Sequence, residues 1–324
     1  MRRAVIGLGT ALTLLAAALP TAAQSGAGGG TFVTLGTMGG PVPDGTRSQP
    51  ANVLIHAGGA YLIDAGDGAV QQLAKAGIAL PQVRAVFLSH LHADHTGGLS
   101  AVLALRNQTK VAGQLIVYGP PGTRELVAGM AASMQPAARA GYGIPGQPWA
   151  APDSTVTVVE LVDGSIAELG LMRVRAAQNT HYDFAPGSAE DRAHKSLSYR
   201  FDLPGRSIVY TGDTGPSVAV EQLARGADLL VSEMIDLDAT MATVARNSPN
   251  MPEPARRDLL QHLSTHHLTA IDVGRLASRA GVRAVVITHF AGGTGKARRP
   301  SRYVRQVRQN FTGPVAIAND LDRF

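Results

Sequence analysis

Residues 90–95 read His-Leu-His-Ala-Asp-His and place three imidazoles and one carboxylate within six positions. The segment directly follows an apolar, partly β-branched run at 83–89, which predicts a short buried strand. Gly97 and Gly98 come next, and the apolar stretch at 99–105 predicts a helix. The cluster is therefore placed on a loop at the carboxyl end of a strand, where α/β proteins often carry their chemistry. A polar surface loop is the alternative, but this density of ligand-type side chains favours a metal site.

Three more ligand-type side chains stand where apolar strands end. Asp213 follows the strand predicted at 207–210, His289 follows the one at 284–288, and His181 comes shortly after another. A lone histidine at a strand end is more often structural, so the shared placement carries the argument. With the cluster they make too many ligands for one tetrahedral ion, but they suit two ions that share a bridging carboxylate. The predicted metal ligands are His90, His92, Asp94, His95, His181, Asp213 and His289.

Short apolar runs predict hairpins first and then alternating strands and helices in each half of the chain. This order indicates an α/β fold in which sheets are sandwiched between helices. A loop-rich stretch at 135–153 holds the only tryptophan, Trp149, and is interpreted as a flap whose role is open. Further strands are predicted at 31–35, 52–56, 60–64, 115–118, 155–159, 171–175, 196–203 and 228–231, and helices at 69–76 and 269–280.

The N-terminus has the pattern of a secretory signal peptide. Arg2 and Arg3 precede an apolar stretch at 4–19, and small residues at 21–23 predict cleavage after Ala23. The apolar stretch is short for a membrane span, and no other segment is predicted to cross a bilayer. We therefore expect a periplasmic or secreted protein without stable membrane insertion.

Composition limits the number of domains and the kinds of partner that the rest of the chain can have. Its 324 residues are 45% hydrophobic, which is enough for one sizeable core, and no linker divides residues 31–324. Residues 24–30 are Gly-rich and are predicted to form a flexible segment that precedes this single domain. The formal charge of +5 does not demand a nucleic-acid partner, and the absence of cysteine excludes disulfides and lipid attachment through a thiol. A homodimer is compatible with the sequence.

The ordered ligand set resembles the metallo-β-lactamase superfamily of binuclear hydrolases. The resemblance covers nearly all of the mature chain and implies an αββα sandwich, with two mixed β-sheets flanked by helices. It also implies two zinc ions, for which manganese or iron could substitute, and a bridging hydroxide as nucleophile, because metal coordination lowers the pKa of water from about 15.7 to about 7. By this resemblance His90, His92 and His181 hold the first ion and Asp94, His95 and His289 the second, with Asp213 between them.

Within the superfamily, the motifs at 35–41, 118–123 and 207–214 resemble the arylsulfatase and transfer-RNA 3′-processing group. The branch with a zinc-bound thiolate is disfavoured because the chain has no cysteine. The group has an additional histidine before the last ligand, and His267 resembles it. This implies that His267 protonates the leaving group or stabilises developing charge. The predicted catalytic residues are therefore Asp94 and His267.

Supporting positions are also implied. Asp64 resembles the carboxylate that orients a ligand histidine, and Glu233 is placed to support His267 by a hydrogen bond. Each could instead be an ordinary strand-end carboxylate. His262 and His266 are interpreted as surface or packing residues.

The substrate is predicted from the length of one segment. Only about thirty residues separate His181 from Asp213, which leaves no room for the RNA-binding arm that the tRNA-processing branch carries there. Together with the predicted export, this favours a small-molecule ester and no nucleic acid. The predicted function is hydrolysis of small sulfate esters or phosphodiesters by an arylsulfatase-like, binuclear zinc enzyme. A lactonase or β-lactamase-type acyl hydrolase is the alternative, and a silent binding protein is disfavoured by the full ligand set.

Overall fold

The computed structural model describes residues 29–43, 45–292 and 300–324. The predicted signal peptide at 1–23 and most of the Gly-rich segment at 24–30 lie outside these residues. Export of the protein and the proposed domain boundaries therefore stay predictions. Every helix within the described part of the chain is too short or too polar to cross a lipid bilayer.

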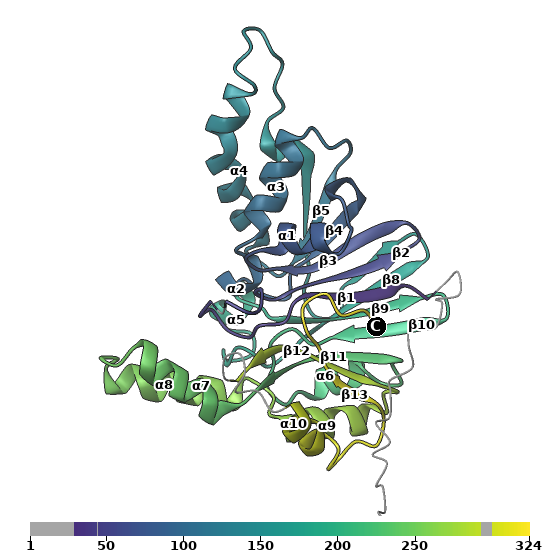
Figure 1. Ribbon diagram of the computed structural model, residues 1–324, viewed down its shortest axis with the longest axis vertical. Helices are drawn as coiled ribbons and strands as arrows, with labels where there is room; N and C mark the ends of the chain where they lie inside the picture. Colours follow the sequence, from purple (N-terminus) through teal and green to yellow (C-terminus); the bar gives the residue numbers. More distant parts are fainter. Residues whose placement is uncertain (1–28, 44, 293–299) are drawn as a thin grey trace, which may run out of the picture.

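The first sheet has six strands in sequential order (Figure 1). β1 to β3 pair antiparallel, because a two-residue turn with positive φ at both Ala57 and Gly58 joins β2 to β3. β3 to β6 pair in parallel, because helices connect them. The strands are β1 (Thr31–Gly36), β2 (Ala51–His56), β3 (Gly59–Ala65), β4 (Val83–Phe87), β5 (Leu115–Gly119) and β6 (Val156–Glu160).

The second sheet repeats this plan with seven strands, again in sequential order. β7 to β10 pair antiparallel and β10 to β13 pair in parallel. Two of its strands, β7 and β13, have no counterpart in the sequence prediction. The strands are β7 (Ile166–Leu169), β8 (Met172–Gln178), β9 (Leu197–Leu203), β10 (Arg206–Tyr210), β11 (Leu229–Ile235), β12 (Val285–Ala291) and β13 (Val315–Ile317).

The two sheets pack face to face, and helices cover their outer faces (Figure 1). Alternate residues of one strand enter different layers: Phe87 of β4 packs between the sheets, whereas Val86 packs under helices. The predicted αββα sandwich, an α/β fold with two mixed sheets, is confirmed. The helices are α1 (Ala69–Lys75), α3 (Leu99–Gln108) and α4 (Thr123–Ala140) on the first sheet, and α6 (Val218–Leu223), α9 (Ala270–Ala280) and α10 (Pro300–Val307) on the second.

The loop-rich stretch predicted at 135–153 differs from the structure. Helix α4 continues through Pro136 to Ala140, and the following loop, with α3 and α4, lines a cavity of about 850 Å³. This loop leads into the amino end of β6, whereas the predicted ligands lie near carboxyl ends of strands. Part of the stretch expected to be loop is therefore helix, and the remaining loop enters the sheet at the opposite end of a strand from the predicted ligands.

Two helices that the sequence did not predict, α7 (Leu237–Asn247) and α8 (Glu253–Thr265), project from the sandwich (Figure 1). Neither contains a buried residue. Asp236 caps the first turn of α7 and accepts a 2.6 Å hydrogen bond from the Tyr303 hydroxyl of α10. The base of the projection is thereby tied to the helical layer beside the second sheet.

Candidate metal centre

All seven predicted ligands come together at one edge of the sandwich, because carboxyl ends of parallel strands meet there. His90 and His92 follow β4, and a four-residue helix, α2 (Ala93–Thr96), begins directly after His92. The segment is therefore partly helical, where an irregular loop was expected. His289 lies inside β12 with a φ of +38°, where a position just after the strand was expected.

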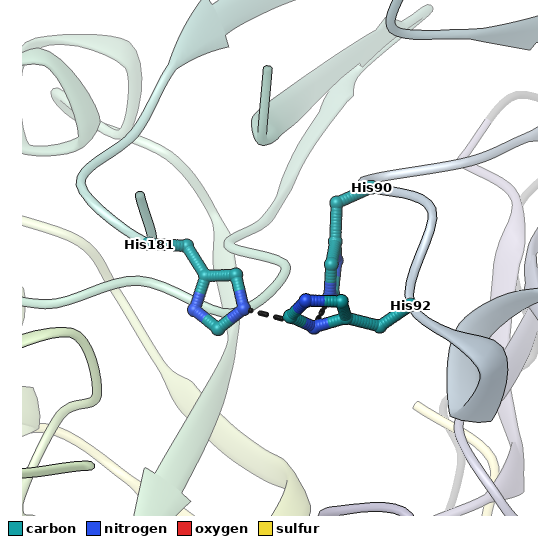
Figure 2. A group of neighbouring side chains, drawn as sticks. All are labelled: His90, His92 and His181. Atoms are coloured by element: carbon teal, nitrogen blue, oxygen red, sulfur yellow. Dashed lines mark hydrogen bonds between the residues drawn. The ribbon is translucent and has the colours of Figure 1, made fainter. Parts of the chain in front are cut away.

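The imidazoles of His90, His92 and His181 form the first cluster (Figure 2). His92 Nδ1 lies 3.0 Å from His90 Nε2 and 3.2 Å from His181 Nε2. Burial lowers the pKa of all three histidines, most strongly for His90 and His181, which favours the neutral form that binds metals. Three ring nitrogens this close fit one shared cation.

Hydrogen bonds fix the orientation of two of these rings. His90 Nδ1 donates over 3.1 Å to the Ser89 hydroxyl, and His181 Nδ1 donates over 3.3 Å to the backbone carbonyl of His266. Each ring consequently has its Nε2 lone pair left for a metal ion.

Asp94, His95 and His289 form the second cluster. Asp94 Oδ2 lies 3.6 Å from His95 Nε2 and 3.7 Å from His289 Nε2. Within the described residues, both of these ring nitrogens and Asp213 Oδ1 are buried without a hydrogen-bond partner. Such atoms are costly to bury unpaired, and their chemistry fits ligation of a divalent cation.

Asp213 stands between the two clusters. Its Oδ1 lies 3.3 Å from His95 Nε2 and 3.2 Å from His289 Nε2, whereas its Oδ2 lies 4.0 Å from His90 Nε2. Burial opposes its ionisation, but His289 and His95 outweigh burial and hold the pKa of Asp213 well below its usual range. The carboxylate is thus ionised and turns one oxygen toward each cluster.

The same charges make this point attractive to cations. Burial alone would lower the pKa of His95 and His289, but Asp213 and the other carboxylates around them together outweigh burial and raise the pKa of both. Burial would also raise the pKa of Asp94, yet His95 and His289 lower it. Two ionised carboxylates in a dry site therefore favour added positive charge, from protons or from a metal ion.

Asp64 supports the centre from beneath, at the end of β3. It accepts hydrogen bonds from the Ser89 backbone (2.7 Å) and hydroxyl (2.8 Å), the Tyr210 hydroxyl (2.7 Å) and His95 Nδ1 (2.8 Å). The bond to His95 Nδ1 leaves Nε2 of that ring to face Asp213. Asp64 itself is fully buried and has a φ of +56°, a conformation that aspartate tolerates better than most residues.

His267 lies between α8 and α9, next to the first cluster. Its Nδ1 donates over 2.8 Å to Glu233 Oε2, which is the hydrogen bond expected from the sequence. Burial alone would lower the pKa of His267, but the Glu233 carboxylate raises it to about 9. Its ring centroid lies 5.1 Å from that of His181, so the ring stands beside the first cluster.

Two residues near the centre were missed or undervalued. His262 of α8 was interpreted as a surface or packing residue; its ring centroid lies 5.1 Å from that of His181, and burial lowers its pKa to about 4. Tyr182 packs on His181, His92 and His90. The position of Tyr182 directly after a predicted ligand was the one available signal, whereas nothing in the sequence indicated that α8 returns to the site.

Gly66 sets the distance between β3 and α2, and its substitution is expected to disturb the second cluster. A Cβ at this position would lie 2.2 Å from the backbone oxygen of Asp94, so Gly66→Ala must move α2. We expect a loss of about 1–3 kcal/mol in unfolding free energy and weaker metal binding, measured by urea denaturation and zinc titration. Gly129→Ala in α4 is the control, because its Cβ meets nothing within 4 Å, and it should be neutral or slightly stabilising. Equal behaviour of the two variants would contradict this account.

Comparisons with known proteins agree with this geometry. Residues 60–290 match the model of the beta-lactamase superfamily domain. Ribonuclease Z of Mycolicibacterium paratuberculosis is 31% identical over 294 residues, which are 90% of this chain and 96% of the relative. Ribonuclease Z of Mycobacterium marinum is 29% identical over 90% of this chain and 97% of the relative.

Solved structures show the same fold. Human tRNase Z, short form, superposes with a TM-score of 0.62 over 91% of this chain and 98% of that chain, at 21% identity. A metallo-beta-lactamase fold protein of Bacillus subtilis reaches a TM-score of 0.65 over 91% of this chain and 99% of that chain, at 16% identity. This fold implies divalent metal ions, and the histidine clusters suit them.

These relatives overturn the substrate predicted from the sequence. Proteins named ribonuclease Z match nearly end to end, which contradicts both sulfate ester hydrolysis by an exported enzyme and a small-molecule substrate with no nucleic acid. The prediction relied on the short segment between His181 and Asp213. Projecting structure is present elsewhere in this chain, in α7 and α8, so the length of that segment alone does not exclude a large substrate.

Proposed function

This chain belongs to the β-lactamase superfamily and is a metal-dependent hydrolase of ester bonds, and we propose that it hydrolyses phosphodiester bonds in RNA. The observation that supports this most strongly is the shared placement of seven ligand-type side chains with the His267–Glu233 pair beside them. The match to proteins named ribonuclease Z supports RNA as the substrate class.

We further propose that the centre holds two zinc ions. When bound, such ions lower the pKa of a coordinated water and neutralise charge on phosphoryl oxygens. Asp213 would be shared between the ions, as its two oxygens already face different clusters. The first ion would be held by His90, His92 and His181, and the second by Asp94, His95 and His289.

The side chains of this centre have separate tasks in the proposed reaction. Asp94 and Asp213 supply the negative charge that keeps the cations in place. As the oxygen of the attacking water bonds to phosphorus and the bond from phosphorus to the leaving oxygen breaks, His267 would donate its Nε2 proton to that leaving oxygen. Glu233 accepts the hydrogen bond from Nδ1 and so orients the ring. A substrate oxygen at the first cluster would lie beside His267, because the rings of His267 and His181 are in contact.

The substrate class is tested directly with purified, zinc-loaded protein. We expect cleavage of an RNA that carries an unpaired 3′ extension, seen as discrete shorter products on a denaturing gel, and loss of cleavage after chelation and its return with zinc. The same preparation is assayed with an aryl sulfate and a lactone. Turnover of either compound without RNA cleavage would contradict the proposal.

His267→Ala is expected to slow cleavage of RNA by about 10²–10⁴-fold in kcat, the usual contribution of a general acid. An aryl phosphodiester with a nitrophenolate leaving group should be much less affected, because that group departs without a proton. Steady-state kinetics on both substrates, with metal content measured alongside, separates the two cases. An equal loss on both substrates with full metal content would refute the acid role, and added imidazole should partly restore RNA cleavage.

A further inference from the structure

A row of aromatic side chains leads away from the first histidine cluster. The ring centroid of Tyr182 lies 5.1 Å from that of His181 and 5.5 Å from that of His92. The ring of Phe184 lies 5.7 Å from that of Tyr182, and the ring of His194 lies 5.7 Å from that of Phe184. Tyr182, Phe184 and His194 are called the aromatic row below.

The row becomes more exposed with distance from the centre. Tyr182 is half-buried, Phe184 is 38% exposed, and His194 is exposed. Its rings are tilted by 49° and 41° to their neighbours, so they do not cover each other face to face. The exposed ring of Phe184 thus continues the ring surface of Tyr182 outward from the first histidine cluster.

The segment that carries the row is held in place. Asp191 of α5 (Ala189–Ala193) accepts hydrogen bonds from the Gly187 backbone at 2.8 Å, from Gln178 Nε2 at 2.9 Å and from Lys195 Nζ at 2.7 Å. These bonds tie Gly187, α5 and Lys195 to Gln178 at the end of β8. The backbone on the carboxyl side of Phe184 is therefore anchored to the second sheet, which lowers the entropy that this part of the segment loses on binding.

We propose that the aromatic row is a stacking platform for an unpaired nucleobase next to the phosphodiester bond that is cleaved. This rests on the proposed function, because the platform begins at the first histidine cluster. Aromatic side chains bind bases through their faces, and only a base outside a double helix offers a free face. The row would thus favour RNA whose strand is single at the cleavage point.

The charged residues beside the aromatic row help to distinguish two roles for it, stacking on a base and binding of phosphate. The exposed charged residues of the segment are Asp183, Glu190 and Arg192, which together carry a net charge of −1. The segment itself therefore offers no cluster of exposed cations for a phosphate backbone. The contribution of the row should therefore be nearly independent of salt, unlike contacts that release counterions from phosphates.

Phe184→Ala tests the platform with two matched RNAs, one of which has an abasic residue at the nucleotide that flanks the cleaved bond. We expect KM for the complete RNA to rise by about 5- to 100-fold, with a much smaller change in kcat, and to rise equally at low and high salt. The abasic RNA should show no difference between Phe184→Ala and the parent protein. Phe184→Trp should restore the KM, and Tyr142→Ala, which removes an exposed aromatic ring outside the site, should have no effect.

Each outcome decides the proposal. A KM that rises as much with the abasic RNA, or that Phe184→Trp does not restore, would overturn the platform while RNA cleavage by the parent protein still supported the proposed function. If the parent protein cleaves no RNA, the proposed function fails, and binding of the two RNAs to the zinc-loaded protein by fluorescence anisotropy then tests the platform alone. A KM that rises only for an aryl phosphodiester would assign the row to a small aromatic ester and would also refute the nucleobase.

Discussion

Asp213→Ala is expected to lower turnover by about 10³-fold or more and to reduce the zinc content below two ions per chain. The carboxylate is buried, ionised and within 3.3 Å of the ring nitrogens of both His95 and His289. Its removal takes away the negative charge that both clusters share. The water-activating effect of the ions, which moves a pKa from about 15.7 to about 7, is then lost or weakened.

Metal content by mass spectrometry and RNA turnover, measured on one preparation, check this expectation. Asp238→Ala is the matched control, because Asp238 is an exposed aspartate in α7. It should retain metal content and turnover. Two bound ions and ordinary turnover in Asp213→Ala would show that this carboxylate does not bridge the clusters.

Asp64→Ala is expected to have the largest effect on stability, together with a 10- to 100-fold loss in zinc affinity. The variant leaves the Ser89 backbone, the Tyr210 hydroxyl and His95 Nδ1 without their acceptor in a fully buried place. Loss of one partner from such a buried, charged network costs about 3–5 kcal/mol. The ring of His95 also loses the hydrogen bond that aims Nε2 at Asp213.

Denaturant unfolding with and without zinc measures both effects. Asp67→Ala is the control, since Asp67 is exposed and follows Asp64 by only three residues. Asp67→Ala should unfold at the same denaturant concentration as the parent protein. A parent-like midpoint and zinc affinity in Asp64→Ala would mean that Asp64 does not organise the centre.

Strands and ligands could be predicted from the sequence because they follow local rules. Apolar, β-branched runs such as the one that became β4 are buried on both faces in a four-layer sandwich, so they stand out from the polar residues after them. His90, Asp213 and the other ligand-type residues follow such runs. Their meeting at one edge follows from the parallel direction of the strands.

Other features depend on contacts that no local pattern contains. Helix α2 has four residues, and its ligand side chains mask any helical periodicity. Helices α7 and α8 project from the sandwich and bury no residue, and nothing in their local sequence shows that they leave the core. The approach of His262 to His181, and of Phe184 to Tyr182, comes from the chain path after these residues have left the strands.

The predicted substrate was the largest error of the sequence analysis, and this error has a physical cause. The length of the segment between His181 and Asp213 shows only whether an RNA-binding arm can be inserted there. It carries no information on structure that projects from another part of the chain. The side chains that touch substrate beside a metal centre lie in such connecting segments, which vary while the sandwich is retained. The chemistry of the centre is therefore more predictable than the molecule it acts on.

Anomalous X-ray diffraction from zinc-loaded crystals of the protein tests the central claim most directly. The account predicts two zinc peaks per chain, one within about 2.0–2.1 Å of nitrogens of His90, His92 and His181, and one bound by Asp94, His95 and His289, with Asp213 touching both. A single peak, or two peaks that share none of these side chains, would contradict it.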